Sequence, residues 1–309
     1  MLSAGGTMGA YWMSGALQAL DEFGLDPRSA EVIVGTSAGS AIGAILACGH
    51  QPWVPTQADE IPLADIAPTA ETPGGRWWDM RSQLGLIRSG LLPPYDVAIP
   101  AVFGGLIPSG RFLTDHIERL IWSHVESARG DLHRGLKVVA VDRTSGRRTV
   151  FGARPAERLP YAVAASCAIP GYFAPVQIGS HSFIDGGVHN VFNLDLALDG
   201  RPAPVLVLSA LTGPIPLNFG PSWLGMRVFR GTVGVQLGRA VSSARRAGFP
   251  VTVLEPSSEE TLAMGRDLMN GADAELAYRI GLSRTRQKLR SADWQRRLGR
   301  FVPAHAAAS

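Results

Sequence analysis

Cysteine and lysine are scarce in this chain. Its 309 residues include two cysteines, Cys48 and Cys167, and lysine occurs only at Lys137 and Lys288. Neither cysteine has the spacing of a metal ligand, and both lie among small apolar residues, so we expect buried free thiols. The sequence therefore gives no sign of a secreted fold that depends on disulfides.

Long hydrophobic runs are also missing. No uninterrupted apolar run reaches the roughly 18–20 residues of a membrane-spanning helix. The first residues, Met1 to Gly6, have no basic segment followed by an apolar core, which a signal peptide would need. The default expectation is therefore a location in the cytoplasm or at the periphery of a membrane.

The chain has no strong excess of charge and no cluster of metal-ligating residues. A formal net charge of +3 is too small to indicate a nucleic-acid partner. No group of histidine, cysteine, aspartate and glutamate has ligand spacing, so neither a metal nor another cofactor is expected. Nothing in the sequence indicates the oligomeric state.

The chain does contain a large apolar fraction, with 46% hydrophobic and 18% charged residues, which is typical of a globular protein with a sizeable core. Apolar, β-branched segments that predict strands lie at 31–34, 136–141, 205–210 and 251–254, with a hairpin partner at 147–151. Helical patterns lie at 13–23, 114–125, 160–167, 227–247 and 272–289. This alternation predicts an α/β fold, a three-layer α/β/α sandwich with a largely parallel central sheet.

We expect a single domain over residues 1–309. Its motif-bearing core covers about 1–200, and a helical C-terminal extension covers about 222–309. A proline-rich insertion or cap is predicted at about 50–112. The apolar part of that insertion, from residue 77 onward, fits either a packed cap over the core or a lid that admits an acyl chain or contacts a membrane.

The most informative motif is Gly35-Thr36-Ser37-Ala38-Gly39, which has the form G-x-S-x-G. An apolar strand pattern precedes it and a run of small apolar residues follows it, which predicts a strand that turns into a helix at Ser37. This is the arrangement of a nucleophile elbow, in which a serine hydroxyl is exposed and aimed. A tight glycine turn without any chemistry explains the pentapeptide equally well.

Two further motifs favour the chemical interpretation. The stretch from Ala4 to Gly9, with Gly5 and Gly6 in it, precedes a helix and can gather backbone N–H groups around an anion. A phosphate loop and a dinucleotide loop are weaker interpretations, because the P-loop lysine and the full G-x-G-x-x-G are missing. Asp185-Gly186-Gly187 follows a short strand and places a carboxylate on a tight turn.

With these three motifs in this order, the chain resembles the patatin-like phospholipases. Their signature is a glycine-rich loop, then G-x-S-x-G, then D-G-G or D-G-A. Residues 164–175 also resemble the family's A-S-x-A-I-P-x-x-F-x-P block, and the resemblance covers about residues 1–200.

The resemblance implies a lipid acyl hydrolase with a Ser–Asp dyad and an acyl-enzyme intermediate. Ser37 would be the nucleophile and Asp185 the base, with Gly5 and Gly6 as backbone donors to the oxyanion. The motif glycines that accompany them are Gly35, Gly39, Gly186 and Gly187. A desolvated carboxylate is a stronger base than one in water, which is consistent with this assignment. The implied partner is a lipid or another acyl ester, with peripheral contact to a membrane.

The chain departs from the family pattern at the glycine loop. Ala4 replaces its first glycine, and Met8 stands where many members carry arginine. Only Met1 to Ser3 represent the strand that normally precedes the loop, which indicates a start assigned too late or a clipped chain. These departures put the positioning of the oxyanion donors in question.

Alternatives to the hydrolase remain. An acyltransferase or thioesterase would use the same dyad, and a catalytically impaired module would only bind lipid. A Ser–His–Asp triad would need a late histidine, and the only late one is His305; a capping or surface role is favoured for His189. The basic residues of the C-terminal helix form either a solvated face or a contact with anionic lipid. They are Arg284, Arg286, Lys288, Arg290, Arg296, Arg297 and Arg300.

Overall fold

The computed structural model describes residues 1–51, 110–128, 131–216 and 221–301. The helices are α1 (Gly6–Glu22), α2 (Ala38–Ala47), α5 (Asp115–Glu126), α6 (Leu159–Ser166), α7 (Leu224–Arg246), α8 (Ser258–Ala263), α9 (Ala274–Leu289) and α10 (Ala292–Leu298). The strands are β1 (Ile33–Thr36), β2 (Leu136–Asp142), β3 (Arg148–Phe151), β4 (Val176–Ile178), β5 (His181–Asp185), β6 (Val205–Leu208) and β7 (Val251–Leu254). The predicted insertion at 50–112 lies almost wholly outside the described residues.

The α/β class is confirmed, but the sheet is mixed rather than largely parallel. β1 pairs with β2 in parallel, as β6 does with β7. β3 and β5 run antiparallel to β2, and β4 runs antiparallel to β5. The antiparallel strands enter through two hairpins, β2–β3 and β4–β5, whose short connections leave no room for a crossover helix.

The N-terminal segment joins the two groups of strands. Leu2 forms parallel bridges with Gly35 on β1 and with Leu208 on β6. The N–H of Leu2 donates to the carbonyl of Val34 at 2.8 Å, and that of Ser3 donates to the carbonyl of Leu208 at 3.1 Å. Met1 to Ser3 therefore occupy the position of a central strand between β1 and β6. The helix predicted to begin at residue 13 begins at Gly6, so most of the glycine stretch from Ala4 to Gly9 is helical.

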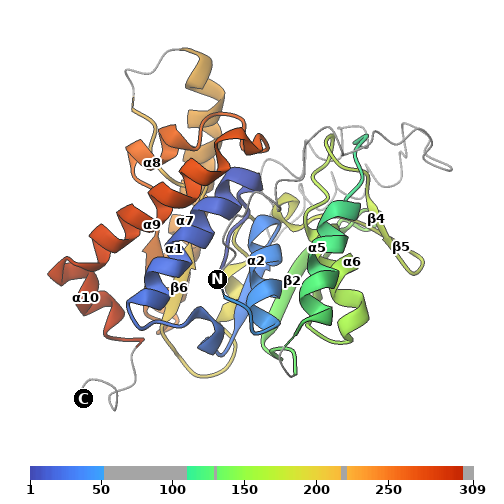
Figure 1. Ribbon diagram of the computed structural model, residues 1–309, viewed down its shortest axis with the longest axis horizontal. Coiled ribbons are helices and arrows are strands. Elements are labelled where there is room, and N and C mark those ends of the chain that lie inside the picture. The colour runs from blue at the N-terminus through green and yellow to red at the C-terminus, as the bar shows by residue number, and fades with distance from the viewer. Residues whose placement is uncertain (52–109, 129–130, 217–220, 302–309) are drawn as a thin grey trace.

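The side chains of β6 alternate between two apolar clusters, which shows that helices cover both faces of the sheet. Val205 and Val207 pack in one apolar cluster with side chains of α7, among them Val233 and Leu237. Leu208 packs in the other cluster, with side chains of α1 and α2. Successive strand residues point to opposite faces, so α7 lies behind the sheet and α1 and α2 in front of it, as Figure 1 shows. This is the three-layer arrangement that the sequence predicts.

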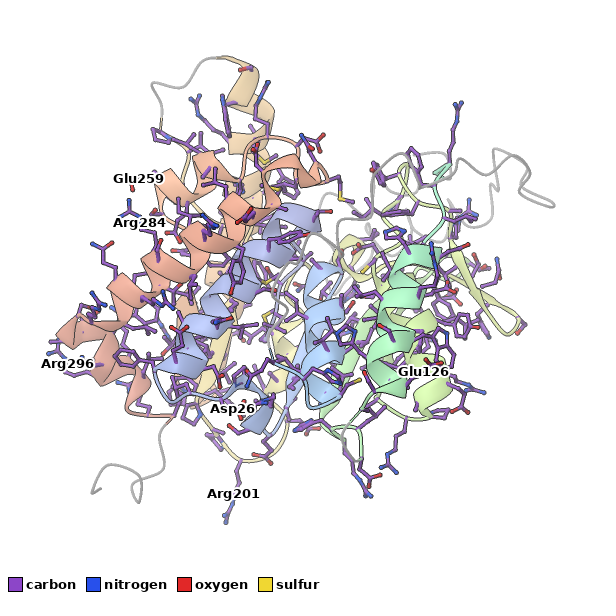
Figure 2. The ribbon with its side chains drawn as sticks, in the orientation of Figure 1. Asp26, Glu126, Arg201, Glu259, Arg284 and Arg296 are labelled. Atoms are coloured by element: carbon purple, nitrogen blue, oxygen red, sulfur yellow. The ribbon has the colours of Figure 1, made fainter. Side chains whose placement is uncertain are left out.

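Ion pairs hold α9 against the body of the protein. Arg286 pairs with Glu22 of α1 at 2.7 Å, and Arg284 pairs with Glu259 of α8, which Figure 2 labels beside it. Many of the basic residues predicted to form a solvated or lipid-binding face are therefore engaged within the molecule.

One of these contacts is buried. Glu260 has no exposed surface, and it accepts hydrogen bonds from the Trp12 indole at 2.9 Å and from the Lys288 ammonium at 3.0 Å. The same carboxylate accepts from the backbone N–H of Ser257 at 2.7 Å and completes a capping box on α8. One buried charge thus connects α1, α8 and α9.

Candidate active site

Ser37 sits on a strained turn between β1 and α2. Its φ of +52° and ψ of −124° lie in a region that non-glycine residues rarely occupy, and its side chain is buried. The Ser37 N–H donates to the Ser166 hydroxyl at 2.9 Å, and the Ser40 hydroxyl donates to the Ser37 carbonyl at 2.6 Å. These two bonds hold the backbone in this conformation.

The glycines that flank Ser37 are required by close backbone contacts. A Cβ atom on Gly35 would lie 2.5 Å from the carbonyl oxygen of Gly39. One on Gly39 would lie 2.3 Å from the carbonyl oxygen of Leu2. The G-x-S-x-G spacing therefore lets β1, α2 and the N-terminal segment meet at the turn.

Asp185 ends β5 within reach of Ser37. The Ser37 hydroxyl is near enough to the Asp185 carboxylate to favour its charged form, and the N–H of Gly187 donates to Asp185 Oδ1 at 2.7 Å. Burial raises the pKa of Asp185 to about 6, because desolvation outweighs these two contacts, which favour the charged form. No histidine contributes to this shift among the described residues.

Strand register explains why these two residues meet. Thr36, the last residue of β1, pairs with Val139, and Asp185, the last residue of β5, pairs with the next β2 residue, Ala140. The carboxyl ends of two strands therefore fall at neighbouring positions of β2. A Cβ on Gly186 would lie 2.2 Å from the Val139 carbonyl oxygen, so the backbone of the turn after Asp185 also packs closely against β2.

The glycine loop forms the start of α1 next to this turn. Gly5 is the N-cap of α1, and Gly6 adopts a φ of +60°. Among the described residues, the N–H groups of Gly5, Gly6 and Thr7 donate to no acceptor. Such unpaired N–H groups, with the positive end of the helix dipole, provide a place for an anion.

The two departures from the family loop are buried. Ala4 is 8% exposed, and its Cβ lies 3.6 Å from where a Cβ on Gly187 would be, so it packs against the aspartate turn. Met8 is 2% exposed and belongs to the apolar core in front of the sheet. Its N–H donates to the Leu268 carbonyl at 3.0 Å, which ties the first turn of α1 to the segment between α8 and α9.

Sequence reasoning missed three residues beside the candidate dyad. Ser166 accepts from the Ser37 N–H and donates to the Val139 carbonyl at 2.6 Å. Cys167 Sγ lies 3.9 Å from the Ser40 hydroxyl, within hydrogen-bond reach. Burial, with a smaller contribution from the Asp185 charge, raises the pKa of the Cys167 thiol, so it stays neutral. The A-S-C sequence before Ala168 was the signal from which Ser166 and Cys167 could have been identified as neighbours of the candidate dyad. Both cysteines are free and buried, as predicted.

Asn193 is the third missed residue. Its φ is +51°, and its Nδ2 donates to the hydroxyl of Thr36, which precedes Ser37, at 3.0 Å. Arg148 donates to Asn193 Oδ1 at 3.2 Å and pairs with Asp195 at 2.6 Å. This series of contacts connects the segment after the aspartate turn to the turn at Ser37. No sequence motif predicts it.

Three further sequence-based expectations concern metals, membrane spans and a late histidine. No group of three or more histidine, cysteine, aspartate or glutamate side chains in the described part of the chain could hold a metal. No helix of that part is long and apolar enough to cross a membrane. His305 lies outside the described residues.

Comparison with known proteins identifies the family. The family model of the patatin-like phospholipases matches residues 1–198, and the chain belongs to this family. No curated protein gives a significant match.

Among solved structures, the chain is similar to VipD from Legionella pneumophila, at 15% sequence identity and a TM-score of 0.44. That match covers 93% of this chain but only 66% of the VipD chain.

Proposed function

We propose that the protein is a serine hydrolase that cleaves carboxylic esters of lipids through an acyl-enzyme on Ser37. The observation that carries this proposal is a buried Asp185 beside the Ser37 hydroxyl, with its pKa raised to about 6. A base with a pKa just below neutral pH is ionised there and still binds a proton well, which suits general base catalysis.

In the first half-reaction, the Asp185 carboxylate takes the proton from Ser37 Oγ as that oxygen attacks the ester carbonyl carbon. The carbonyl π electrons move to oxygen and form the oxyanion. When they return, the bond to the alcohol oxygen breaks, and the protonated Asp185 gives its proton to the leaving alcohol. In the second half-reaction, a water molecule transfers a proton to Asp185 and attacks the acyl carbon. When the bond from that carbon to Ser37 Oγ breaks, Asp185 returns the proton to Oγ, and the fatty acid and the Ser37 hydroxyl are released.

The N–H groups of Gly5 and Gly6 are the proposed donors to the oxyanion. They have no acceptor among the described residues, and α1 directs the positive end of its dipole to the same place. Because Ala4 and Met8 are packed into the core, the loop is fixed by apolar contacts rather than by a charged side chain. The departures at these positions therefore fit a formed oxyanion hole.

Turnover of short p-nitrophenyl esters tests the dyad. Ser37→Ala and Asp185→Asn are each expected to abolish turnover. Ser14→Ala serves as the control, because Ser14 is a buried serine of α1 whose hydroxyl lacks a described hydrogen-bond partner. Turnover retained in either dyad variant would refute the mechanism. Ester products formed when an alcohol is added would indicate acyl transfer in place of hydrolysis.

A further inference from the structure

The most exposed apolar side chains of the described residues gather on α7. Leu224 is 58% exposed, Val228 62% and Val235 56%, and no other large apolar side chain exceeds 50%. With Gly231, these residues follow one another at intervals of four, three and four, which places them on one side of a helix. We call these four residues the α7 stripe, and it extends over about 16 Å.

The fold does not need this stripe to be apolar. The opposite side of α7 carries Val233, Leu237 and Val241, which pack against β6 and β7. On the stripe itself, a Cβ added to Gly231 would meet nothing within 4 Å. A solvent-facing helix side normally carries polar residues, so an exposed apolar stripe indicates a surface that binds something.

The same side of α7 becomes basic further along. Arg239 and Arg246 continue the spacing beyond Val235, and both are exposed. Neither forms an ion pair with a described residue, in contrast to Arg284, Arg286 and Lys288 of α9, whose partners are Glu259, Glu22 and Glu260. An apolar half followed by unpaired cations matches acyl chains next to anionic head groups.

The stripe lies at the same edge of the molecule as the candidate active site. In Figure 1 the first half of α7 rises above the body, close to α8 and above the start of α1. Arg266, in the segment between α8 and α9, donates to the Ser222 carbonyl at 3.3 Å, and its guanidinium lies 6.0 Å from the centre of the Trp223 ring. This segment therefore contacts the start of α7.

A cavity lies beside that contact and reaches Met8 in the first turn of α1. Its volume is about 510 Å³, and its lining residues include Arg266, Asp267 and Met8. Met8 is two residues beyond Gly6, and both contact Leu268 from the same segment. The cavity therefore lies between the first turn of α1 and the segment that contacts the start of α7.

We propose that the α7 stripe docks the protein on an anionic lipid bilayer, with Leu224, Val228 and Val235 among the acyl chains and Arg239 and Arg246 at the phosphates. This inference rests on the proposed function, because an ester at the bilayer surface must reach Ser37 from this edge. A lipid surface is favoured over a protein partner because exposed apolar side chains and arginines that form no ion pair with a described residue lie on one side of one helix, which matches acyl chains beside anionic head groups.

Vesicle flotation tests the docking without turnover, in a Ser37→Ala background. Leu224→Asp/Val228→Asp is expected to reduce binding to vesicles of equal phosphatidylglycerol and phosphatidylcholine at least tenfold. The control is Val150→Asp, which places one negative charge at another exposed valine, 41% exposed on β3. Arg239→Gln/Arg246→Gln should weaken binding to these vesicles and leave the weaker binding to pure phosphatidylcholine unchanged.

A fluorescent label gives an independent readout. Val228→Cys can be labelled with an environment-sensitive maleimide, because burial raises the pKa of Cys48 to about 11 and also raises that of Cys167, so both native thiols react slowly. Emission from Val228→Cys should shift to the blue on vesicles, and emission from labelled Val150→Cys should not.

Equal vesicle binding by the double aspartate variant and Val150→Asp would overturn the proposal. So would loss of self-association with unchanged vesicle binding, which would make the stripe an interface between copies of this chain. With Ser37 present, the double aspartate variant should hydrolyse a soluble ester at the wild-type rate. If wild type hydrolyses no ester and still binds vesicles through the stripe, the docking stands and the proposed function fails.

Discussion

Replacing Asp185 by asparagine is expected to stabilise the protein while it abolishes turnover. Burial raises the pKa of Asp185 to about 6, against an ordinary value of 3.8. The folded protein therefore binds this proton more tightly than the unfolded chain does. As pH rises through the window from about 4 to 6, the free energy of unfolding falls, because the folded state must accommodate a buried charge.

The magnitude follows from the same two values. They differ by about two pH units, which at 1.36 kcal/mol each corresponds to about 3 kcal/mol above pH 6. Asparagine keeps an oxygen that can accept the Gly187 N–H but carries no charge. For a chain of 309 residues, Asp185→Asn should raise the melting temperature by about 5 °C at pH 8. At pH 5 the gain should be about half as large, since part of the wild-type Asp185 is then protonated.

Thermal unfolding of wild type and Asp185→Asn between pH 5 and 8 measures this difference. The matched control is Asp142→Asn, at the end of β2. Burial acts to raise the pKa of Asp142, but hydrogen bonds from Ser145 and His181 outweigh it and hold that pKa below its ordinary value. Asp142→Asn should therefore lower stability at neutral pH. A gain for Asp185→Asn that does not change with pH, or a loss, would refute the assignment of a buried, raised-pKa carboxylate.

Three other changes have distinct expected outcomes. Glu260→Ala should lower the free energy of unfolding, measured by urea denaturation, by about 3 kcal/mol, because Lys288 and Trp12 lose a buried partner. The control, Glu259→Ala, removes an exposed ion pair and should lower it by less than about 1 kcal/mol. Gly39→Ala should lower the free energy of unfolding by about 3 kcal/mol, because the new Cβ would lie 2.3 Å from the Leu2 carbonyl oxygen. Gly231→Ala, where a Cβ meets nothing within 4 Å, should raise it by about 1 kcal/mol. Similar effects of the two changes would contradict this packing. Ser166→Ala should lower the free energy of unfolding by about 2 kcal/mol and slow ester turnover, because the Ser37 N–H loses its acceptor. Unchanged turnover would show that the turn at Ser37 keeps its conformation without this hydrogen bond.

The regular elements were predictable wherever one short pattern determines them. The strand expected at 136–141 is β2 over Leu136–Asp142, and the helix expected at 114–125 is α5 over Asp115–Glu126. Both have an apolar pattern strong enough to set the local structure without help from distant residues. The helix expected at 13–23 begins earlier, at Gly6, with Gly5 as its N-cap.

Contacts between distant segments could not be predicted. That β1 and β5 end at neighbouring residues of β2 depends on strand order and register, which no local pattern encodes. The acceptor for the Ser37 N–H comes from Ser166, 129 residues away. Likewise, the basic residues of α9 suggest a free charged face until their partners on α1 and α8 are placed. The motifs identified the candidate residues, and the tertiary structure supplied their environment.

The most direct test of the central claim is the site of reaction with a fluorophosphonate, which forms a covalent bond with an activated serine. Intact-mass spectrometry of the wild-type protein should show one adduct, and peptide mapping should place it on Ser37. Ser37→Ala should give no adduct, and in wild type the labelling rate should rise with pH to a half-maximum near 6, as Asp185 ionises. An unlabelled wild type, or an adduct on another serine, would contradict the assignment of Ser37 as the nucleophile.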